Sequence, residues 1–259
     1  MTTTASSGGG GATGRVPGGA DVIGGPSRVI GMSERPTALV TGASRGVGAA
    51  IARALAPTHD LLLGGRDTEA LATVASGLPG ARPWPVELTA VTETDVADVD
   101  RLDVLVHSAG VVTLGRVEET PAEAWRRTME INLIAVAELT RLLLPALRAA
   151  GGHVVLINSG SGQRTSPGWG SYSASKYALR AFADVLRLEE PGLRVTTIYP
   201  GRVDTDMQRG VRDQEGGPYQ PEKYLDADSV ARAALAALTA SPDAHVTEIT
   251  VRPAAGPPN

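Results

Sequence analysis

Short apolar runs typical of buried β-strands alternate along this 259-residue chain with segments whose apolar residues recur at helical spacing. In the segment 46–56, for example, the residues Val47, Ala50, Ile51 and Ala54 mark one helical face. Regular alternation of strands and helices is typical of a parallel sheet that is covered by helices on both faces. We therefore predict a three-layer, doubly wound α/β fold with a seven-stranded parallel sheet. The predicted strands are 37–41, 61–64, 82–86, 102–107, 152–158, 193–199 and 245–251, and the predicted helices are 46–56, 67–77, 121–149, 171–189 and 226–240.

The two ends of the chain differ in composition from the rest. Residues 1–31 contain ten glycines and few large apolar side chains, so they cannot bury enough surface to offset the entropy of ordering them. We expect 1–34 to form a disordered Gly-rich tail, 35–253 to form a single domain, and 254–259 to form a flexible C-terminus. Met32 directly precedes the first predicted strand region, so the tail is either an over-extended translation start or a genuine flexible appendage.

Charge and composition exclude several classes of protein. The formal net charge is −4 and the chain has no block of basic residues, so a nucleic-acid partner is not expected. No apolar run approaches the roughly 20 residues that span a bilayer. The chain contains no cysteine, which excludes disulfides, thiolate metal sites and thiol nucleophiles. We expect a cytoplasmic protein that binds neither nucleic acid, nor membrane, nor metal.

A glycine-rich turn joins the first predicted strand to the first predicted helix. Residues 41–48 read TGASRGVG. Glycines permit a tight turn and a close approach of the backbone to a pyrophosphate, while the following helix points its free N–H groups at the anion. A glycine-rich turn can also be a plain strand-to-helix joint, but the order strand, turn, helix favours nucleotide binding. The predicted contacts are Gly42, Ser44, Arg45, Gly46, Val47 and Gly48.

The end of the second predicted strand bears on which dinucleotide binds. An acidic residue there would hold the ribose 2′-hydroxyl of NAD, whereas an arginine accommodates the 2′-phosphate of NADP. Gly65 stands at the position of the acid, Arg66 follows it, and Arg45 lies in the glycine-rich turn. This pattern favours NADP(H) over NAD(H). If Asp67 turns inward instead of capping the following helix, NAD becomes the better choice.

A tyrosine and a lysine one helical turn apart form the second informative pair. Tyr172 and Lys176 share one face of the predicted helix 171–189. At about 4 Å and an effective dielectric near 20, an ammonium would stabilise a phenolate by about 4 kcal/mol, or three pKa units, and desolvation would oppose only part of this effect. Of the 24 basic residues, 22 are Arg, so a lysine at this place is notable. The alternative is a solvated lysine beside a packing tyrosine.

Together, the glycine-rich turn, the Tyr172-x-x-x-Lys176 pair and the order of the strands between them resemble the short-chain dehydrogenase/reductase family, which has a Rossmann-like fold. The resemblance covers about residues 36–252. It implies that Ser159, thirteen residues before Tyr172, polarises the carbonyl group of the substrate. Ser161 is the second candidate for this role.

The resemblance also implies a mechanism. A hydride passes from the nicotinamide to a ketone or aldehyde, and Tyr172 gives a proton to the developing alkoxide. Lys176 would hold the nicotinamide ribose and tune Tyr172, and Asn132 would position a water that replaces the proton. The further cofactor contacts that the family implies are Glu87, Leu88, Ser108, Ala109, Gly110, Pro200, Gly201, Val203 and Thr205.

Some positions depart from the family pattern. His107 and Ser108 stand where the family usually has two asparagines. His107 is either a second acid–base group or a structural histidine bonded to nearby backbone, and the second interpretation is favoured. Glu87 replaces the usual aspartate near the adenine. The C-terminus lacks the Gly-Gly ending of many tetrameric members, which weakens the expectation of a tetramer.

The sequence leaves the substrate open. Residues 206–225 look too irregular for a regular element and are expected to form a mobile lid, and Trp169 is expected to line the substrate pocket. The leading hypothesis is an NADPH-dependent carbonyl reductase, and the alternatives are an NAD-dependent alcohol dehydrogenase and a catalytically silent cofactor-sensing regulator. The outer faces of helices 121–149 and 171–189 are expected to form a homodimer or homotetramer.

Overall fold

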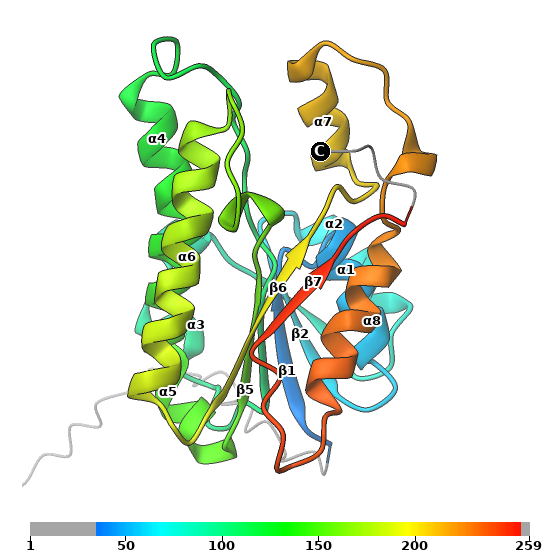
Figure 1. Ribbon diagram of the computed structural model, residues 1–259. Helices are drawn as coiled ribbons and strands as arrows, with labels where there is room; N and C mark the ends of the chain where they lie inside the picture. The colour runs from blue at the N-terminus through cyan, green and yellow to red at the C-terminus, as the bar shows by residue number, and fades with distance from the viewer. Residues whose placement is uncertain (1–34, 255–259) are drawn as a thin grey trace, which may run out of the picture. The chain divides into compact units, whose positions relative to one another are not determined.

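The computed structural model describes residues 35–254, which contain one seven-stranded sheet. The strand order is β3-β2-β1-β4-β5-β6-β7, and every neighbouring pair is parallel (Figure 1). This confirms the predicted sheet. The strands are β1 (Thr37–Thr41), β2 (Asp60–Gly65), β3 (Ala81–Pro85), β4 (Val104–His107), β5 (His153–Ile157), β6 (Arg194–Pro200) and β7 (Glu248–Val251).

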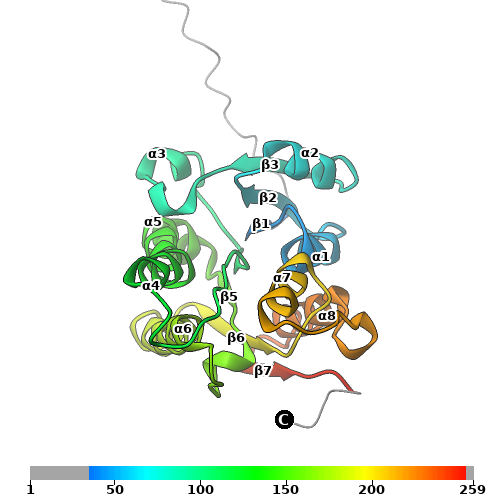
Figure 2. The same cartoon turned by 90° about the horizontal axis from the view of Figure 1, so that it is seen from above.

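Helices cover both faces of the sheet (Figure 2). Side chains of α1, α2 and α8 pack with one face of the sheet, and side chains of α5 and α6 pack with the other. The central strands are therefore buried on both sides, which explains why they read as continuous apolar runs. The helices are α1 (Gly46–Leu55), α2 (Thr68–Ser76), α3 (Glu93–Val96), α4 (Ala122–Met129), α5 (Ala135–Ala150), α6 (Gly170–Glu189), α7 (Asp206–Glu215) and α8 (Ala227–Leu238).

The long helix predicted at 121–149 contains a local change of winding. A π-helical turn at Glu130–Ile134 separates α4 from α5, and the amide of Ala135 bonds the carbonyl of Glu130, five residues back. A π-turn accommodates one extra residue in a continuous helix and is common at functional sites. Asn132 lies inside this turn and is 1% exposed.

The prediction that 206–225 lacks a regular element is wrong. The helix α7 occupies Asp206–Glu215, and a 3₁₀ turn follows at Pro221–Lys223. The hydroxyl of Thr205 accepts a hydrogen bond from the amide of Gln208 at 3.3 Å and caps the start of the helix. Gly216 ends it in the left-handed conformation, with φ of 69°.

The remaining expectations about the chain ends fall largely outside the described residues. The expected tail at 1–34 lies wholly outside them, as do residues 255–259 of the expected flexible C-terminus. Within 35–254, none of the helices is both long and apolar enough to cross a bilayer.

Candidate active site

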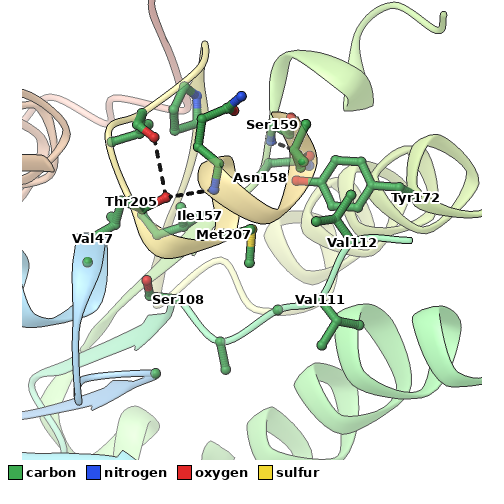
Figure 3. Close-up of a pocket in the computed structure, with 18 of the residues that line it drawn as sticks. Val47, Ser108, Val111, Val112, Ile157, Asn158, Ser159, Tyr172, Thr205 and Met207 are labelled. Carbon is green, nitrogen blue, oxygen red and sulfur yellow. Dashed lines mark hydrogen bonds between the residues drawn. The ribbon is translucent and has the colours of Figure 1, made fainter. Parts of the chain in front are cut away.

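A pocket of about 1060 Å³ opens at the carboxyl ends of the strands (Figure 3). This is the edge of an open parallel sheet at which ligands bind. Every cofactor contact expected from the sequence lines it, together with Ser159 and Ser161. Asn132 does not line the pocket. These expected contacts, all of which line the pocket, are Gly42, Ser44, Arg45, Gly46, Val47, Gly48, Arg66, Glu87, Leu88, Ser108, Ala109, Gly110, Tyr172, Lys176, Pro200, Gly201, Val203 and Thr205.

The glycine-rich turn is packed so closely against neighbouring backbone that a side chain at Gly42 or Gly48 would clash. Gly42 has φ of 65°, and a Cβ there would lie 2.9 Å from the backbone of Ala109. A Cβ on Gly48 would lie 2.2 Å from the carbonyl oxygen of Gly42. The helix α1 begins at Gly46, and the side chain of Arg45 does not cap it. The closely packed turn and the helix N-terminus together fit the pyrophosphate of a dinucleotide.

The charges at the end of β2 have identifiable partners. An Arg66 guanidinium nitrogen lies 3.7 Å from a carboxylate oxygen of Glu87. The carboxylate of Asp67 accepts a hydrogen bond from the amide of Ala70 at 3.0 Å, and so it caps α2. Gly65 ends β2 and lines the pocket at the position where an NAD-type acid would stand, so no carboxylate side chain occupies that position. Asp67 therefore takes the capping role that the sequence offered as one of its two possibilities.

Ser159 and Tyr172 meet at the far side of the pocket. Ser159 lies two residues after the end of β5 and Tyr172 in the first turn of α6, and the Ser159 hydroxyl lies close enough to the Tyr172 hydroxyl to lower the pKa of the phenol. Figure 3 shows the ring of Tyr172 pointing toward Ser159. The hydroxyl of Ser159 also accepts a hydrogen bond from the amide of Ser161 at 3.1 Å, which fixes its direction. Of the two candidate serines, Ser159 is the one that contacts Tyr172.

Lys176 lies buried beside Tyr172, one turn along the same helix. Its side chain is 5% exposed, the Nζ atom lies 5.8 Å from the centre of the Tyr172 ring, and Nζ donates a hydrogen bond to the carbonyl of Ile157 at 3.1 Å. Burial lowers the pKa of Lys176 to about 8. The ammonium form is therefore the main form at neutral pH, and it does not face solvent.

The pKa of Tyr172 moves in the direction opposite to the one that its spacing from Lys176 predicts. Burial raises this pKa above its ordinary value and outweighs the hydrogen bond from Ser159, which lowers it. The physical reason is that desolvation penalises the phenolate more than the contact with Ser159 stabilises it. The phenol is accordingly protonated at neutral pH in the ligand-free protein.

Asn132 anchors the loop that borders the pocket. Its Oδ1 accepts a hydrogen bond from the amide of Val111 at 2.8 Å, and its Nδ2 donates to the carbonyl of Val111 at 2.9 Å. The same Nδ2 donates to the hydroxyl of Ser175 at 3.0 Å. The side chain thus joins the loop after β4 to α6. Any part that Asn132 has in proton transfer remains a prediction.

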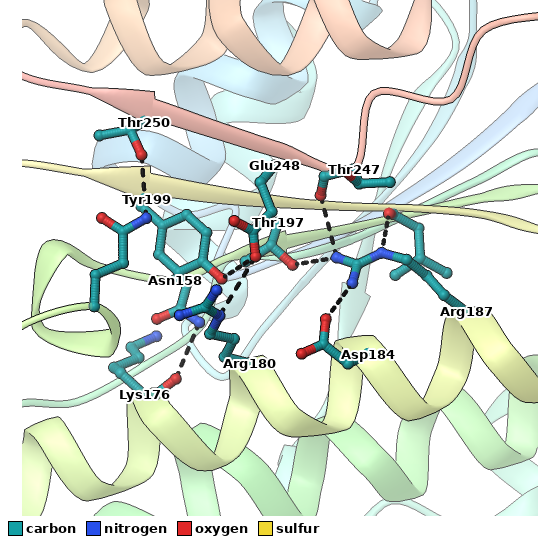
Figure 4. A network of polar contacts seen from close by, with 12 residues as sticks. Asn158, Lys176, Arg180, Asp184, Arg187, Thr197, Tyr199, Thr247, Glu248 and Thr250 are labelled. Atoms are coloured by element: carbon teal, nitrogen blue, oxygen red, sulfur yellow. Dashed lines mark hydrogen bonds and ion pairs between the residues drawn. The ribbon is translucent and has the colours of Figure 1, made fainter.

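Asn158 is the residue that sequence reasoning missed at the centre of the site. It is 4% exposed, its Oδ1 accepts a hydrogen bond from the amide of Ser159 at 2.8 Å, and its Nδ2 donates to the carbonyl of Lys176 at 3.0 Å (Figure 4). The only available signal was the rarity of asparagine, which occurs three times in the chain. This side chain sets the distance between the loop of Ser159 and the helix of Lys176.

Arg187 holds the C-terminal half of α6 against the sheet (Figure 4). Its guanidinium donates to the carbonyl of Val195 at 2.9 Å and to the hydroxyl of Thr197 at 3.0 Å, both in β6. It also bonds the carboxylate of Asp184 one turn earlier. This network keeps the helix that bears Tyr172 in a fixed position relative to the strand ends.

His107 is a structural residue. It is 3% exposed, does not line the pocket, and its Nε2 lies 2.9 Å from the hydroxyl of Thr140. Thr140 gives its own proton to the carbonyl of Val136, so the histidine nitrogen is the donor to Thr140. Burial lowers the pKa of His107 to about 3, so the ring is neutral. The favoured structural role is confirmed, although the partner is a side chain and not the backbone.

The wall of the pocket beyond Tyr172 includes residues that the sequence did not mark. Trp169 lines it as expected, and its ring centre lies 5.7 Å from that of Tyr172. The residues that were not predicted include Ile157, Asn158, Arg164, Arg202, Met207 and Arg252. They come from segments that lie far apart in the sequence, including the end of β5, the start of α7 and the residue after β7, so no local sequence motif connects them.

Comparison with known proteins identifies the family. The family model described as short chain dehydrogenase matches residues 36–216. An uncharacterized oxidoreductase of Staphylococcus saprophyticus is 35% identical over 231 residues, which cover 83% of this chain and 96% of that protein. The glycine betaine reductase ATRR of Emericella nidulans is 34% identical over 238 residues, 83% of this chain, but the match spans only 18% of that protein's length.

Solved structures agree with this assignment. An alcohol dehydrogenase of the archaeon Thermococcus sibiricus, complexed with 5-hydroxy-NADP, superimposes with a TM-score of 0.77 at 29% identity, covering 87% of this chain and 100% of that chain. A short-chain dehydrogenase of Shigella flexneri, complexed with NADP, has a TM-score of 0.75 at 28% identity, covering 83% of this chain and 96% of that chain. This chain belongs to the short-chain dehydrogenase/reductase family and is an NAD(P)-dependent oxidoreductase that acts on a small-molecule substrate.

Proposed function

We propose that this chain reduces a ketone or aldehyde to an alcohol with NADPH, and that Tyr172 is the proton donor. The observation that supports the proposal most strongly is that Tyr172, Ser159 and the buried Lys176 line one large pocket, with the Ser159 hydroxyl close enough to Tyr172 to lower the pKa of the phenol. A protonated phenol is the state that a proton donor requires, and burial holds Tyr172 in that state.

Each residue of this group has a distinct task in the proposed reaction. When bound, a dihydronicotinamide supplies a hydride to the carbonyl carbon. The Ser159 hydroxyl donates a hydrogen bond to the carbonyl oxygen and polarises it, and Tyr172 gives its proton to that oxygen as the C=O double bond becomes a C–O–H group. Lys176 holds a positive charge near the phenolate that remains, which lowers the free energy of that charged form.

The residues at the end of β2 support NADPH as the preferred cofactor. Arg66 and Arg45 line the pocket, and the position of the NAD-type acid is taken by Gly65. Asp67 is committed to capping α2, so it does not offer a carboxylate to a ribose. The arginine pair provides planar N–H donors suited to a 2′-phosphate. The alternative, an NAD-dependent alcohol dehydrogenase, predicts instead that NADH is used as well as NADPH.

Two variants of one helix test the proposed chemistry. Tyr172→Phe removes the hydroxyl from the buried ring, whereas Tyr177→Phe removes a hydroxyl from a ring on the same helix that is 41% exposed. We expect NADPH oxidation with a panel of ketones and aldehydes to fall at least about 100-fold in Tyr172→Phe and to stay near the wild-type rate in Tyr177→Phe. Equal rates in wild type and Tyr172→Phe would remove Tyr172 from the mechanism. A wild-type protein that binds NADPH and reduces nothing would favour the catalytically silent regulator.

Exposed apolar side chains on the π-turn before α5 and on α6 support self-association. Four apolar side chains on the π-turn and on α6 are exposed at or above 41% of their area, namely Ile134, Tyr177, Val185 and Leu188. Exposed apolar side chains that gather on neighbouring helices are typical of contact surfaces. We infer a homodimer or homotetramer formed through these helices. Light scattering should give a smaller molar mass for Leu188→Glu than for the wild type.

A further inference from the structure

Arg252 crosses the end of the pocket opposite to the glycine-rich turn. It follows β7, the last strand of the sheet, whereas the glycine-rich turn follows β1. The stem of Arg252 passes Gly201, because a Cβ on that glycine would lie 3.6 Å from the Arg252 Cδ atom. Its guanidinium lies over Gly160, where a Cβ would come within 2.5 Å of Nη1. The positive charge of Arg252 therefore lies beside Gly160, the residue that follows Ser159 in the sequence.

The guanidinium of Arg252 has no carboxylate partner within the described residues. Its one hydrogen bond there goes from Nη2 to the side-chain oxygen of Gln163, at 3.0 Å. Gln163 is itself held by a hydrogen bond from its Nε2 to the hydroxyl of Thr250, at 3.1 Å. A guanidinium has five N–H donors, so most of the hydrogen-bonding capacity of Arg252 is available to a ligand.

The other charges along the pocket do not neutralise this end. Two described carboxylate residues, Glu87 and Asp206, line the pocket, and they lie within 4 Å of Arg66 and Arg45 respectively. Both ion pairs belong to the glycine-rich and β2 end. Burial and, to a smaller extent, the positive charge of Arg164 lower the pKa of the Arg252 guanidinium. The described carboxylates of the pocket therefore pair with other arginines and not with Arg252.

Arg202 also lines the pocket, but its charge is neutralised by a carboxylate, in contrast to that of Arg252. Its guanidinium makes two hydrogen bonds to the carboxylate of Glu215, at 2.8 and 2.7 Å, and its Cζ atom lies 5.8 Å from the centre of the Trp169 ring. Arg202 therefore serves as part of the wall. Arg252 differs from it because its described partner is a neutral amide.

We propose that the substrate of this chain carries a carboxylate group and that Arg252 binds it while the carbonyl oxygen lies at Ser159 and Tyr172. A planar guanidinium matches a carboxylate with two parallel N–H···O bonds. Because Arg252 lies beside Gly160, we expect the substrate to be an oxo acid in which several atoms separate the carbonyl group from the carboxylate. This inference deepens the proposed carbonyl reductase function and rests on it.

Two substrates that differ only in charge test the proposal. They are para-formylbenzoate and its methyl ester, each assayed with NADPH in wild type, Arg252→Gln and Arg252→Lys. Arg232→Gln is the matched control, because Arg232 is exposed, lies outside the pocket and bonds a neutral Ser229 hydroxyl. We expect Arg252→Gln to raise the KM of the acid at least about tenfold more than that of the ester, as removal of a charged hydrogen bond should. Arg252→Lys should restore part of the difference, and Arg232→Gln should change neither KM.

A binding measurement separates failure of this proposal from failure of the proposed reductase activity. Calorimetry of benzoate and of benzamide with the NADP⁺-loaded protein needs no turnover. Tighter binding of benzoate that is lost in Arg252→Gln would support the carboxylate site even if neither aldehyde is reduced. Equal binding of benzoate and benzamide, or equal changes in both KM values, would overturn it. If the ester is reduced and the KM of the acid is the same in wild type and Arg252→Gln, the reductase function stands and the carboxylate site is rejected.

Discussion

The side-chain amide of Asn158 donates a hydrogen bond to the main-chain carbonyl of Lys176 at 3.0 Å, and so a residue at the end of β5 fixes the register of α6. The other end of the same amide accepts the amide proton of Ser159 at 2.8 Å. A single buried side chain therefore spans the two segments that supply the proposed reacting groups. Small displacements of such groups are costly, because proton transfer requires hydrogen-bond distances.

Asn158→Ala should lower kcat by about tenfold or more, with a smaller change in the KM for NADPH, because it releases Ser159 and Lys176 and leaves the glycine-rich turn intact. Asn158→Asp keeps the acceptor for the Ser159 amide and should recover more activity than Asn158→Ala. Steady-state kinetics and a thermal melt of each variant provide the measurement. Gln214→Ala is the control, since Gln214 is an exposed amide that bonds the Leu114 amide. A parallel loss of stability and of NADPH affinity in Asn158→Ala would point to general unfolding instead.

Gly65→Asp should shift the cofactor preference from NADPH toward NADH. A Cβ at Gly65 would meet Leu71 at 3.5 Å, an ordinary contact, so the new side chain fits and places a carboxylate where the 2′-phosphate of NADP would lie. We expect the ratio of kcat/KM for NADPH to that for NADH to fall at least about tenfold, and Arg66→Ala to lower it further.

The neighbouring glycine provides the contrast for that experiment. A Cβ at Gly64 would lie 2.9 Å from the Trp84 ring, so Gly64→Asp should destabilise the protein without changing its preference. An unchanged ratio in a folded Gly65→Asp protein would contradict the assignment of the 2′-phosphate to this corner.

Trp169→Ala should change the range of substrates more than the chemistry. The Trp169 ring lines the pocket, lies 5.7 Å from the Tyr172 ring and packs near Arg202. Removing it enlarges the pocket, so the KM for aromatic aldehydes should rise several-fold while small aliphatic aldehydes keep their kcat. Trp169→Phe should retain most of the wild-type selectivity. A panel of aldehydes of increasing size measures the effect, and an unchanged range in Trp169→Ala would place Trp169 outside the substrate-binding surface.

The seven-stranded parallel sheet and the glycine-rich end of the pocket could be predicted from the sequence because they rest on local patterns. The apolar run at β1 and the glycine-rich turn after it define one end of the pocket without any knowledge of distant residues. The helix α7 was missed because its exposed face is strongly polar, with Val211 as one of its two buried residues and a glycine at position 210. Its caps, Thr205 and Gly216, were visible in the sequence and would have indicated a helix.

The finer geometry of the site depended on contacts between distant segments. Asn132 and Val111 are 21 residues apart in the sequence. Their hydrogen bond depends on the π-turn that holds Asn132, and a π-turn has no simple sequence signal. The pKa of Tyr172 likewise depends on how deeply the ring is buried. The spacing indicated the neighbouring charge, but it could not show that desolvation would be the larger effect.

The stability of the ligand-free protein should depend on the ionisation of Lys176. Burial lowers the pKa of this lysine to about 8, whereas an unfolded lysine has a pKa of 10.5. Between these two values the unfolded chain binds more protons than the folded one, so the free energy of unfolding rises as the pH increases from 8 toward 10.5. Below pH 8 the folded protein bears the full cost of a buried ammonium. A shift of this size corresponds to a change on the order of 3 kcal/mol.

Lys176→Met isolates that contribution. Between about pH 7 and pH 10, the melting temperature of the wild type should rise by several degrees relative to that of Lys176→Met. A chain of this size shifts its melting temperature by about 2–4 °C per kcal/mol. Lys223→Met is the matched control, because Lys223 is the other lysine of the chain and is exposed. Its difference from the wild type should stay constant over the same range. A difference for Lys176→Met that also stays constant would mean that the ammonium is solvated in the folded protein, and the proposed support of Tyr172 by a buried positive charge would then fail.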